Sequence, residues 1–132
     1  MADILYIVVP CYNEEEVLPE TSRRLRAKLE GLMAAGRISE QSRVLFVNDG
    51  SRDKTWNIIE MLHGECPLFS GIDLSRNRGH QNALLAGLMI SADRCDMAIS
   101  MDADLQDDID AVDAMVEQYY CLLYTSDAAD EL

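Results

Sequence analysis

Four aspartates are crowded into one short segment, "DADLQDD" at residues 102–108, of a chain whose formal net charge is already −13. Carboxylates this close repel one another unless water, hydrogen-bond donors or a cation lies among them. Asp102 and Asp104 are two residues apart, so in an extended or turn segment both carboxylates face one side while Ala103 points away. Such a pair suits a hard cation, Mg²⁺ or Mn²⁺. For a lone DxD, solvated acids that cap the next helix are the commoner interpretation.

Three other polar clusters also follow short apolar runs. They are "PCYNEEE" (10–16), "NDGSRDKT" (48–55) and "SRNRGHQ" (75–81). Asp49 could accept a hydrogen bond from the imide N–H of uracil or guanine, which cytosine lacks, or it could merely fix the turn at Gly50. Arg76 and Arg78 carry guanidinium forks that suit phosphate oxygens, and salt bridges to surface acids are an equal alternative. His80 has no acid beside it in the sequence, so we interpret it as a helix-start residue and not as a general base.

The elements that must position these clusters alternate along the chain: each short β-branched run is followed by a helical pattern. This predicts the α/β class, with a mainly parallel sheet of about four strands flanked by helices. The predicted strands are residues 4–10, 43–49, 68–75 and 96–102, and the predicted helices are about 14–35, 54–64 and 80–92, with a further helical pattern over 110–120. Ligands of open parallel sheets lie beyond the carboxyl ends of the strands, so the four clusters should meet there.

The helical patterns also predict packing and caps. Four leucines share one face of the first helix, Leu18, Leu25, Leu29 and Leu32. Gly36 is placed to end that helix, and Ser51 or Asp53 could cap the second. The third contains "ALLAGLMI", which is apolar almost all round and predicts burial between elements. Gly87 in its middle costs about 1 kcal/mol relative to alanine, so we expect a close backbone approach there.

Composition excludes several classes of protein. With 132 residues and 48% hydrophobic content, the chain fits one domain or part of one. The balance of 11 Lys and Arg against 24 Asp and Glu argues against binding to nucleic acid or an anionic membrane surface. The four cysteines form no CxxC pair, so neither a zinc site nor a disulfide framework is indicated and a reducing cytoplasm fits best. No signal peptide or membrane-spanning run is expected.

The four clusters, in this order, resemble the family 2 glycosyltransferases with a GT-A fold. The closest resemblance is to the polyisoprenyl-phosphate hexosyltransferase branch, similar to dolichol-phosphate mannosyltransferases, in which an "RN.GHQ.A...G" run precedes "DADLQ". The resemblance covers residues 4 to about 120 and implies a Rossmann-like nucleotide-binding half. The sequence departs from the common "DLQ.PPE" form, because "DDIDA" has no proline. Asp110 would take the helix-start role there, with Asp107 and Asp108 as first-turn acids.

The resemblance also implies roles for individual residues. Tyr12 would stack on the base, Glu14 would reach the ribose and Asp49 would contact the base. The remaining assignments are Pro10 and Asn13 in the nucleoside pocket, Arg76 and Arg78 on the donor phosphates, Asp102 and Asp104 on the metal and the diphosphate, and Gln106 supporting either. Together these residues would bind a nucleotide-sugar donor with Mg²⁺ or Mn²⁺ as the cofactor.

The implied reaction is transfer of a hexose from a UDP-sugar or GDP-mannose to a polyprenyl phosphate, with inversion at the anomeric carbon. A phosphate acceptor is already ionised at about pH 7 and needs less base assistance than a sugar hydroxyl. The full-length parent would work at the cytoplasmic face of the membrane. Because residues 1–120 match only the nucleotide-binding half of the family's domain, we expect the 132-residue chain to be inactive alone.

The last twelve residues, "CLLYTSDAADEL" (121–132), break the preceding helical pattern. They resemble the translated read-through of a transposase-type sequencing adapter, so we expect a non-native tail; a native flexible tail is the alternative.

Other functional classes match less well. A non-catalytic phospho-receiver domain is also an acidic parallel α/β unit, but it needs a lysine after its last strand and the final lysine here is Lys54. An NAD-type Rossmann protein would need GxGxxG, and a nucleotidyltransferase would need a Gly-rich phosphate loop after the first strand.

Overall fold

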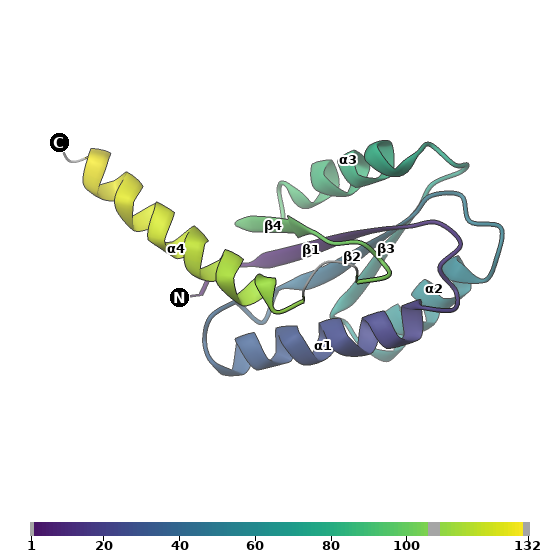
Figure 1. Cartoon of the computed structure of the whole chain (residues 1–132), viewed down its shortest axis with the longest axis horizontal. Coiled ribbons are helices and arrows are strands. Elements are labelled where there is room, and N and C mark those ends of the chain that lie inside the picture. The colour runs from purple at the N-terminus through teal and green to yellow at the C-terminus, as the bar shows by residue number, and fades with distance from the viewer. Residues whose placement is uncertain (1, 106–108, 131–132) are drawn as a thin grey trace.

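The computed structural model describes residues 2–105 and 109–130, with side chains up to residue 122. Figure 1 shows a parallel sheet with helices on both faces. The strands are β1 (Leu5–Cys11), β2 (Arg43–Asn48), β3 (Phe69–Asp73) and β4 (Met97–Ser100), and the helices are α1 (Leu18–Ala34), α2 (Thr55–Glu65), α3 (His80–Ser91) and α4 (Ala111–Asp130). The predicted fold class and all four strands are therefore confirmed.

The sheet order is β3-β2-β1-β4, and all three strand pairs are parallel. The carboxyl ends of the strands therefore lie at one edge, which is where the predicted clusters follow them. β1 is a central strand, yet it contains Pro10, which has no N–H to donate. Its pairing with β4 ends at Val8 and Ser100, so Pro10 lies beyond the last paired residue on that side.

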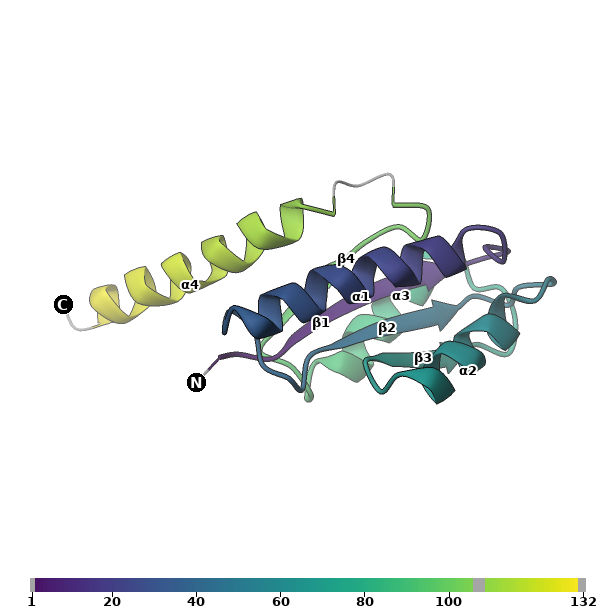
Figure 2. The ribbon, with the colours of Figure 1, turned by 90° about the horizontal axis from the view of Figure 1, so that it is seen from below.

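The α1 side of the sheet holds most of the core. α1 and α2 lie in front of the sheet and α3 behind it in Figure 2. The four predicted leucines of α1 are all buried. The helix ends at Ala34, and Gly36, with a φ of 72°, follows its C-cap as predicted; the N–H groups of Gly36 and Arg37 donate to Met33 O (3.0 Å) and Leu32 O (2.9 Å). α1 begins at Leu18 and not at Glu14, because turns occupy residues 15–17.

The predicted burial of α3 on all sides is wrong. Only Ala83, Gly87 and Ser91 are buried, while Leu85 and Met89 are 54% and 68% exposed. One stripe of the helix packs on the sheet, and no second layer of the described chain covers the rest. The expected close approach at Gly87 is confirmed, since a Cβ there would lie 2.5 Å from Val8 Cγ1 and 2.9 Å from Val47 Cγ2.

The predicted break in the helical pattern at residue 121 is also wrong. α4 continues to Asp130 and projects away from the sheet in Figure 1. Residues 121–130 contain neither glycine nor proline, so nothing in them stops a helix. The start of α4 is attached to the fold, because Lys28 Nζ pairs with Asp110 (3.0 Å) and Asp113 (2.6 Å). Asp110 thus directly precedes the helix, as predicted, while the non-native origin of 121–132 stays a prediction.

Within the described residues, no helix has both the length and the apolar character needed to cross a membrane.

Candidate nucleotide-binding site

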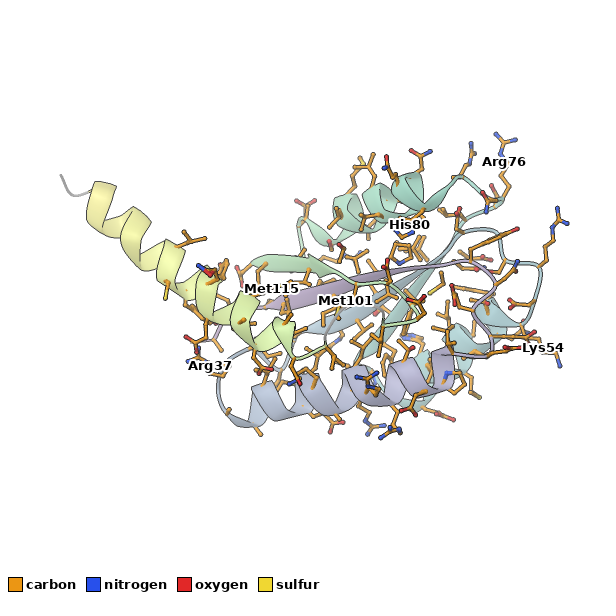
Figure 3. The ribbon with its side chains drawn as sticks, viewed as in Figure 1. Arg37, Lys54, Arg76, His80, Met101 and Met115 are labelled. Atoms are coloured by element: carbon orange, nitrogen blue, oxygen red, sulfur yellow. The ribbon has the colours of Figure 1, made fainter. Side chains whose placement is uncertain are left out.

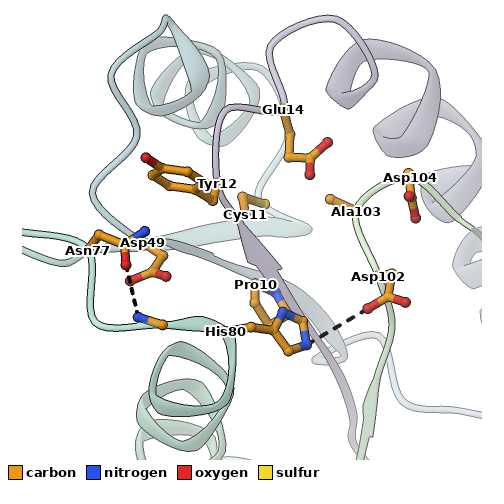
Figure 4. Close-up of a pocket in the computed structure, with 11 residues that line it drawn as sticks. Pro10, Cys11, Tyr12, Glu14, Asp49, Asn77, His80, Asp102, Ala103 and Asp104 are labelled. Atoms are coloured by element: carbon orange, nitrogen blue, oxygen red, sulfur yellow. Dashed lines mark hydrogen bonds and ion pairs between the residues drawn. The ribbon is translucent and has the colours of Figure 1, made fainter.

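A cavity of about 280 Å³ lies at the carboxyl edge of the sheet, and all four polar clusters contribute to it. Its walls are Pro10, Cys11, Tyr12, Glu14, Asp49, Asn77, Gly79, His80, Asp102, Ala103 and Asp104. Figure 4 shows these residues at the end of β1, at the start of α3 and in the segments that follow β1, β2, β3 and β4. The prediction that the four clusters meet is therefore confirmed.

The acidic segment after β4 is held by its own turn and by α1. Leu105 N–H donates to Asp102 O (3.0 Å), and Leu105 has a φ of 52°. Thr21 Oγ1 donates to Ala103 O (2.5 Å). Ala103 is 3% exposed, and the carboxylates on either side of it, Asp102 and Asp104, both line the cavity.

Glu14 is a third carboxylate near this pair. Burial raises the pKa of Glu14, and the negative charges of Asp104, Asp53 and Asp102 raise it further. The acids of the cavity therefore act on one another, as expected where a cation belongs. No group of three or more His, Cys, Asp or Glu side chains in the described chain could hold a metal by itself. Two carboxylates completed by substrate phosphates and waters are an ordinary Mg²⁺ set, so Asp102 and Asp104 fit one.

Asp49 connects the wall of the cavity to the loop after β3. It is 3% exposed, and its Oδ1 accepts the N–H of Arg78 at 2.6 Å. Gly50, with a φ of 66°, brings the same loop even closer, since a Cβ on it would lie 2.2 Å from Asn77 N. One face of the cavity is thus built by two backbone segments in contact.

His80 belongs to the cavity, and it has an acid beside it that could not be predicted from its sequence neighbours. Its Nε2 lies 3.9 Å from Asp102 Oδ1 across the cavity (Figure 4). The two residues are 22 positions apart, and only the strand order, with β4 next to β1, brings them together. His80 therefore has an acidic neighbour in space that the sequence did not reveal.

Cys11 is another wall residue that the sequence did not single out. It is 1% exposed, and burial, followed by the charge of Glu14, raises the pKa of its thiol. A thiol that resists ionisation is a packing group and not a nucleophile. Asn77, Gly79 and Ala103 are the other wall residues that were not predicted. Only their position inside the polar clusters could have indicated that they line the cavity.

Some predicted site residues lie elsewhere. Asn13, Arg76 and Arg78 are exposed and are not wall residues of the cavity, and Arg76 points away from the sheet in Figure 3. Gln106, together with Asp107 and Asp108, lies outside the described residues. Roles of these residues in nucleotide binding stay predictions.

Comparisons with known proteins agree with this geometry. The chain is 47% identical over 117 residues to an uncharacterized glycosyltransferase of Bacillus subtilis, YkoT, covering 89% of this chain and 35% of that protein. It is 41% identical over 105 residues to the undecaprenyl-phosphate 4-deoxy-4-formamido-L-arabinose transferase of Shewanella sediminis, and the match covers 79% of this chain and 29% of that protein. The chain thus spans about a third of the length of these relatives.

Among solved structures, the mannosyltransferase PcManGT from Pyrobaculum calidifontis, in complex with GDP-Man and Mn²⁺, matches with a TM-score of 0.58 at 20% identity, covering 79% of this chain and 28% of that one. This likeness shows the predicted fold, the Rossmann-like half of a GT-A domain. The sequence model described as "Glycosyl transferase family 2" matches residues 6–120. The chain therefore belongs to glycosyl transferase family 2.

Proposed function

We propose that this chain is the nucleotide-sugar-binding half of an inverting, metal-dependent hexosyltransferase that uses a UDP- or GDP-sugar and a polyprenyl phosphate. The observation that carries the proposal is the cavity itself. It gathers Asp49 and Tyr12 on one side and Asp102 and Asp104 on the other, with Glu14 between them (Figure 4). These are groups for a base, a ribose and a diphosphate, in the order in which a nucleotide presents them.

Three wall residues, Asp49, Tyr12 and Glu14, bind the nucleoside in this proposal. Asp49 Oδ1 already accepts Arg78 N–H, which leaves Oδ2 for the imide N–H of uracil or guanine. Tyr12 is 43% exposed at the cavity, so one ring face is open for stacking on the base. Glu14 accepts hydrogen bonds from the ribose hydroxyls.

Charge control at the diphosphate is the task of the acidic segment. Asp102 and Asp104 would hold Mg²⁺ or Mn²⁺, which supplies the positive charge that stabilises a departing nucleoside diphosphate. The turn at Leu105 and the bond from Thr21 keep the two carboxylates in place before the donor arrives. Arg76 and Arg78 are assigned to the donor phosphates because guanidinium groups suit phosphate oxygens, and not because they line the cavity.

The acceptor is proposed from the relatives. One is named as an undecaprenyl-phosphate transferase. An ionised phosphate needs little help from a base, so this acceptor asks less of the site than a sugar hydroxyl would. We place the whole protein at the cytoplasmic face of a membrane, where such lipids are accessible. The phospho-receiver alternative is not favoured, because the chain belongs to a glycosyltransferase family.

Calorimetric titration of the 132-residue chain with UDP, GDP and CDP, with Mn²⁺ or with EDTA, tests the proposal. UDP or GDP should bind in Mn²⁺ and at least about tenfold more weakly in EDTA, and CDP should bind weakly in both. Asp102→Asn and Asp104→Asn should each remove the Mn²⁺ effect, while Asp93→Asn, in the exposed turn after α3, should not. Equal affinity for all three nucleotides, or no effect of EDTA, would contradict the site.

A further inference from the structure

The loop after β1 and the loop after β2 are joined by four hydrogen bonds, each between a side chain and a backbone N–H. Asn13 N–H donates to Ser51 Oγ (2.9 Å), and Arg52 N–H donates to Asn13 Oδ1 (2.8 Å). Glu14 N–H donates to Thr55 Oγ1 (2.8 Å), and Glu15 N–H donates to Asp53 Oδ2 (3.2 Å). We call Asn13, Ser51, Asp53 and Thr55 the loop clamp.

Thr55 is the centre of the clamp. Its side chain is 0% exposed, and its hydroxyl donates to Asp53 Oδ1 (2.5 Å) while it accepts Glu14 N–H. Asp53 Oδ1 also accepts Thr55 N–H (2.9 Å). The hydroxyl is thus fixed in one orientation, with its proton toward Asp53 and its lone pair toward Glu14. Burial raises the pKa of Asp53, but the hydrogen bonds from Thr55 and Glu15 outweigh it, so the net pKa is lowered.

The clamp holds a segment that lies outside the strands and helices. β1 ends at Cys11 and α1 begins at Leu18, so the residues between them belong to neither ladder nor helix. Asn13 has a φ of 54°, a left-handed conformation that an asparagine tolerates better than most residues. Its two neighbours, Tyr12 and Glu14, both line the cavity. The conformation at Asn13 therefore sets where these two side chains point.

We propose that the loop clamp is a set of positioning residues for the nucleotide, acting through Tyr12 and Glu14. None of its four members is a wall residue of the cavity. Asn13 receives a different role from the one that the resemblance implies, because its amide oxygen is bonded to Arg52 N–H across the loops. The inference rests on the proposed function, since placing Tyr12 and Glu14 matters to binding only if the cavity takes a nucleotide.

The test compares Thr55→Val, which keeps the shape and removes the hydroxyl, with Thr55→Ser, which keeps the hydroxyl. Calorimetry with UDP and GDP in Mn²⁺ gives the affinity, and amide hydrogen exchange gives the protection of residues 13–15. Thr55→Val should weaken binding by about threefold to tenfold and speed exchange at Glu14 and Glu15. Thr55→Ser should restore both.

Ser42→Ala is the matched control. Ser42 is also 0% exposed, and its hydroxyl accepts Leu5 N–H at 2.9 Å at the opposite end of β1. This variant should lose stability without losing affinity. Two substitutions at one exposed position, Asn13, provide the test if Thr55→Val does not fold. Asn13→Gly, which keeps the left-handed conformation but not the acceptor, should weaken binding, and Asn13→Asp, which keeps the acceptor, should bind within about threefold of wild type.

The outcomes separate the two proposals. If wild type binds neither nucleotide, the proposed function is wrong and the positioning role is wrong with it, whatever the exchange shows. If wild type binds and Thr55→Val speeds exchange at Glu14 without weakening binding, the clamp orders the loop but does not position the nucleotide. If Asn13→Asp loses affinity as fully as Asn13→Gly, the amide touches the nucleotide directly, and the role proposed for Asn13 is overturned.

Discussion

Gly50→Ala should disrupt the candidate site more than the addition of a methyl group at any other described glycine. The structure allows the loss of unfolding free energy to be estimated. Two costs apply at this position. A φ of 66° costs a non-glycine residue about 1–2 kcal/mol. The new Cβ would also lie 2.2 Å from Asn77 N and 2.5 Å from Arg76 C, which are backbone atoms that cannot rotate away. Forcing them apart adds about 1–3 kcal/mol, so the total loss of unfolding free energy is about 2–5 kcal/mol.

Gly36→Ala is the matched control, because Gly36 has a φ of 72° and nothing within 4 Å of its Cβ position. It should carry the conformational cost alone, about 1–2 kcal/mol. Urea unfolding of both variants measures the difference, and nucleotide titration should show weaker binding only for Gly50→Ala, since the displaced loop carries Asn77 and the N–H that Asp49 accepts. Equal destabilisation by the two substitutions would refute the contact between these loops.

Three further outcomes are expected. Gly87→Ala should destabilise despite better helix propensity, because the gain of about 1 kcal/mol is smaller than the cost of about 1–3 kcal/mol of overpacking against Val8; a more stable variant in urea unfolding would contradict the packing. Asp53, whose pKa is lowered by folding, contributes stability that is present above its unfolded pKa of about 3.8 and is lost as the pH falls through the folded value. Asp53→Asn should therefore be less stable than wild type near pH 6, and the gap should shrink below about pH 3.8, as urea titrations at several pH values can show. Deleting residues 121–132 should leave the thermal midpoint unchanged, since Leu122 is 64% exposed; a clear drop would mean that the tail is packed.

The sequence was sufficient for the elements and for their meeting point. Alternation of apolar runs with helical patterns predicts a parallel sheet, and parallel strands place the residues that follow them at one edge. Asp49 and Asp102 could therefore be brought to one cavity without knowing the strand order. The buried face of α1 was equally predictable, because a helix with leucines along one side buries that side against the sheet.

Other features depend on information that local patterns do not contain. His80 lies near Asp102 because β4 is the strand beside β1. The apolar runs of the sequence predict the strands but do not say which of them are neighbours in the sheet. The wall residues include Asn77 and Gly79 while the side chains of Arg76 and Arg78 stay outside, a distinction set by the turn that Gly50 allows. The prediction that α3 is buried on all sides was wrong because an apolar composition indicates only that a helix tends to be covered. It does not show that another element is present to cover it.

The exposed side of α3 has a consequence for how this polypeptide behaves in concentrated solution. Leu85, Met89 and Ile90 are 54%, 68% and 43% exposed on α3, which no other element of residues 2–105 and 109–130 covers. A formal charge of −13 keeps separate molecules apart at low ionic strength. Added salt shortens the range of that repulsion to about 10 Å at 0.1 M and strengthens the tendency of apolar surface to be covered. Colloidal stability should therefore decrease as salt is raised, the reverse of what is common for proteins near electrical neutrality, and low-salt buffers are the suitable medium for work at high concentration.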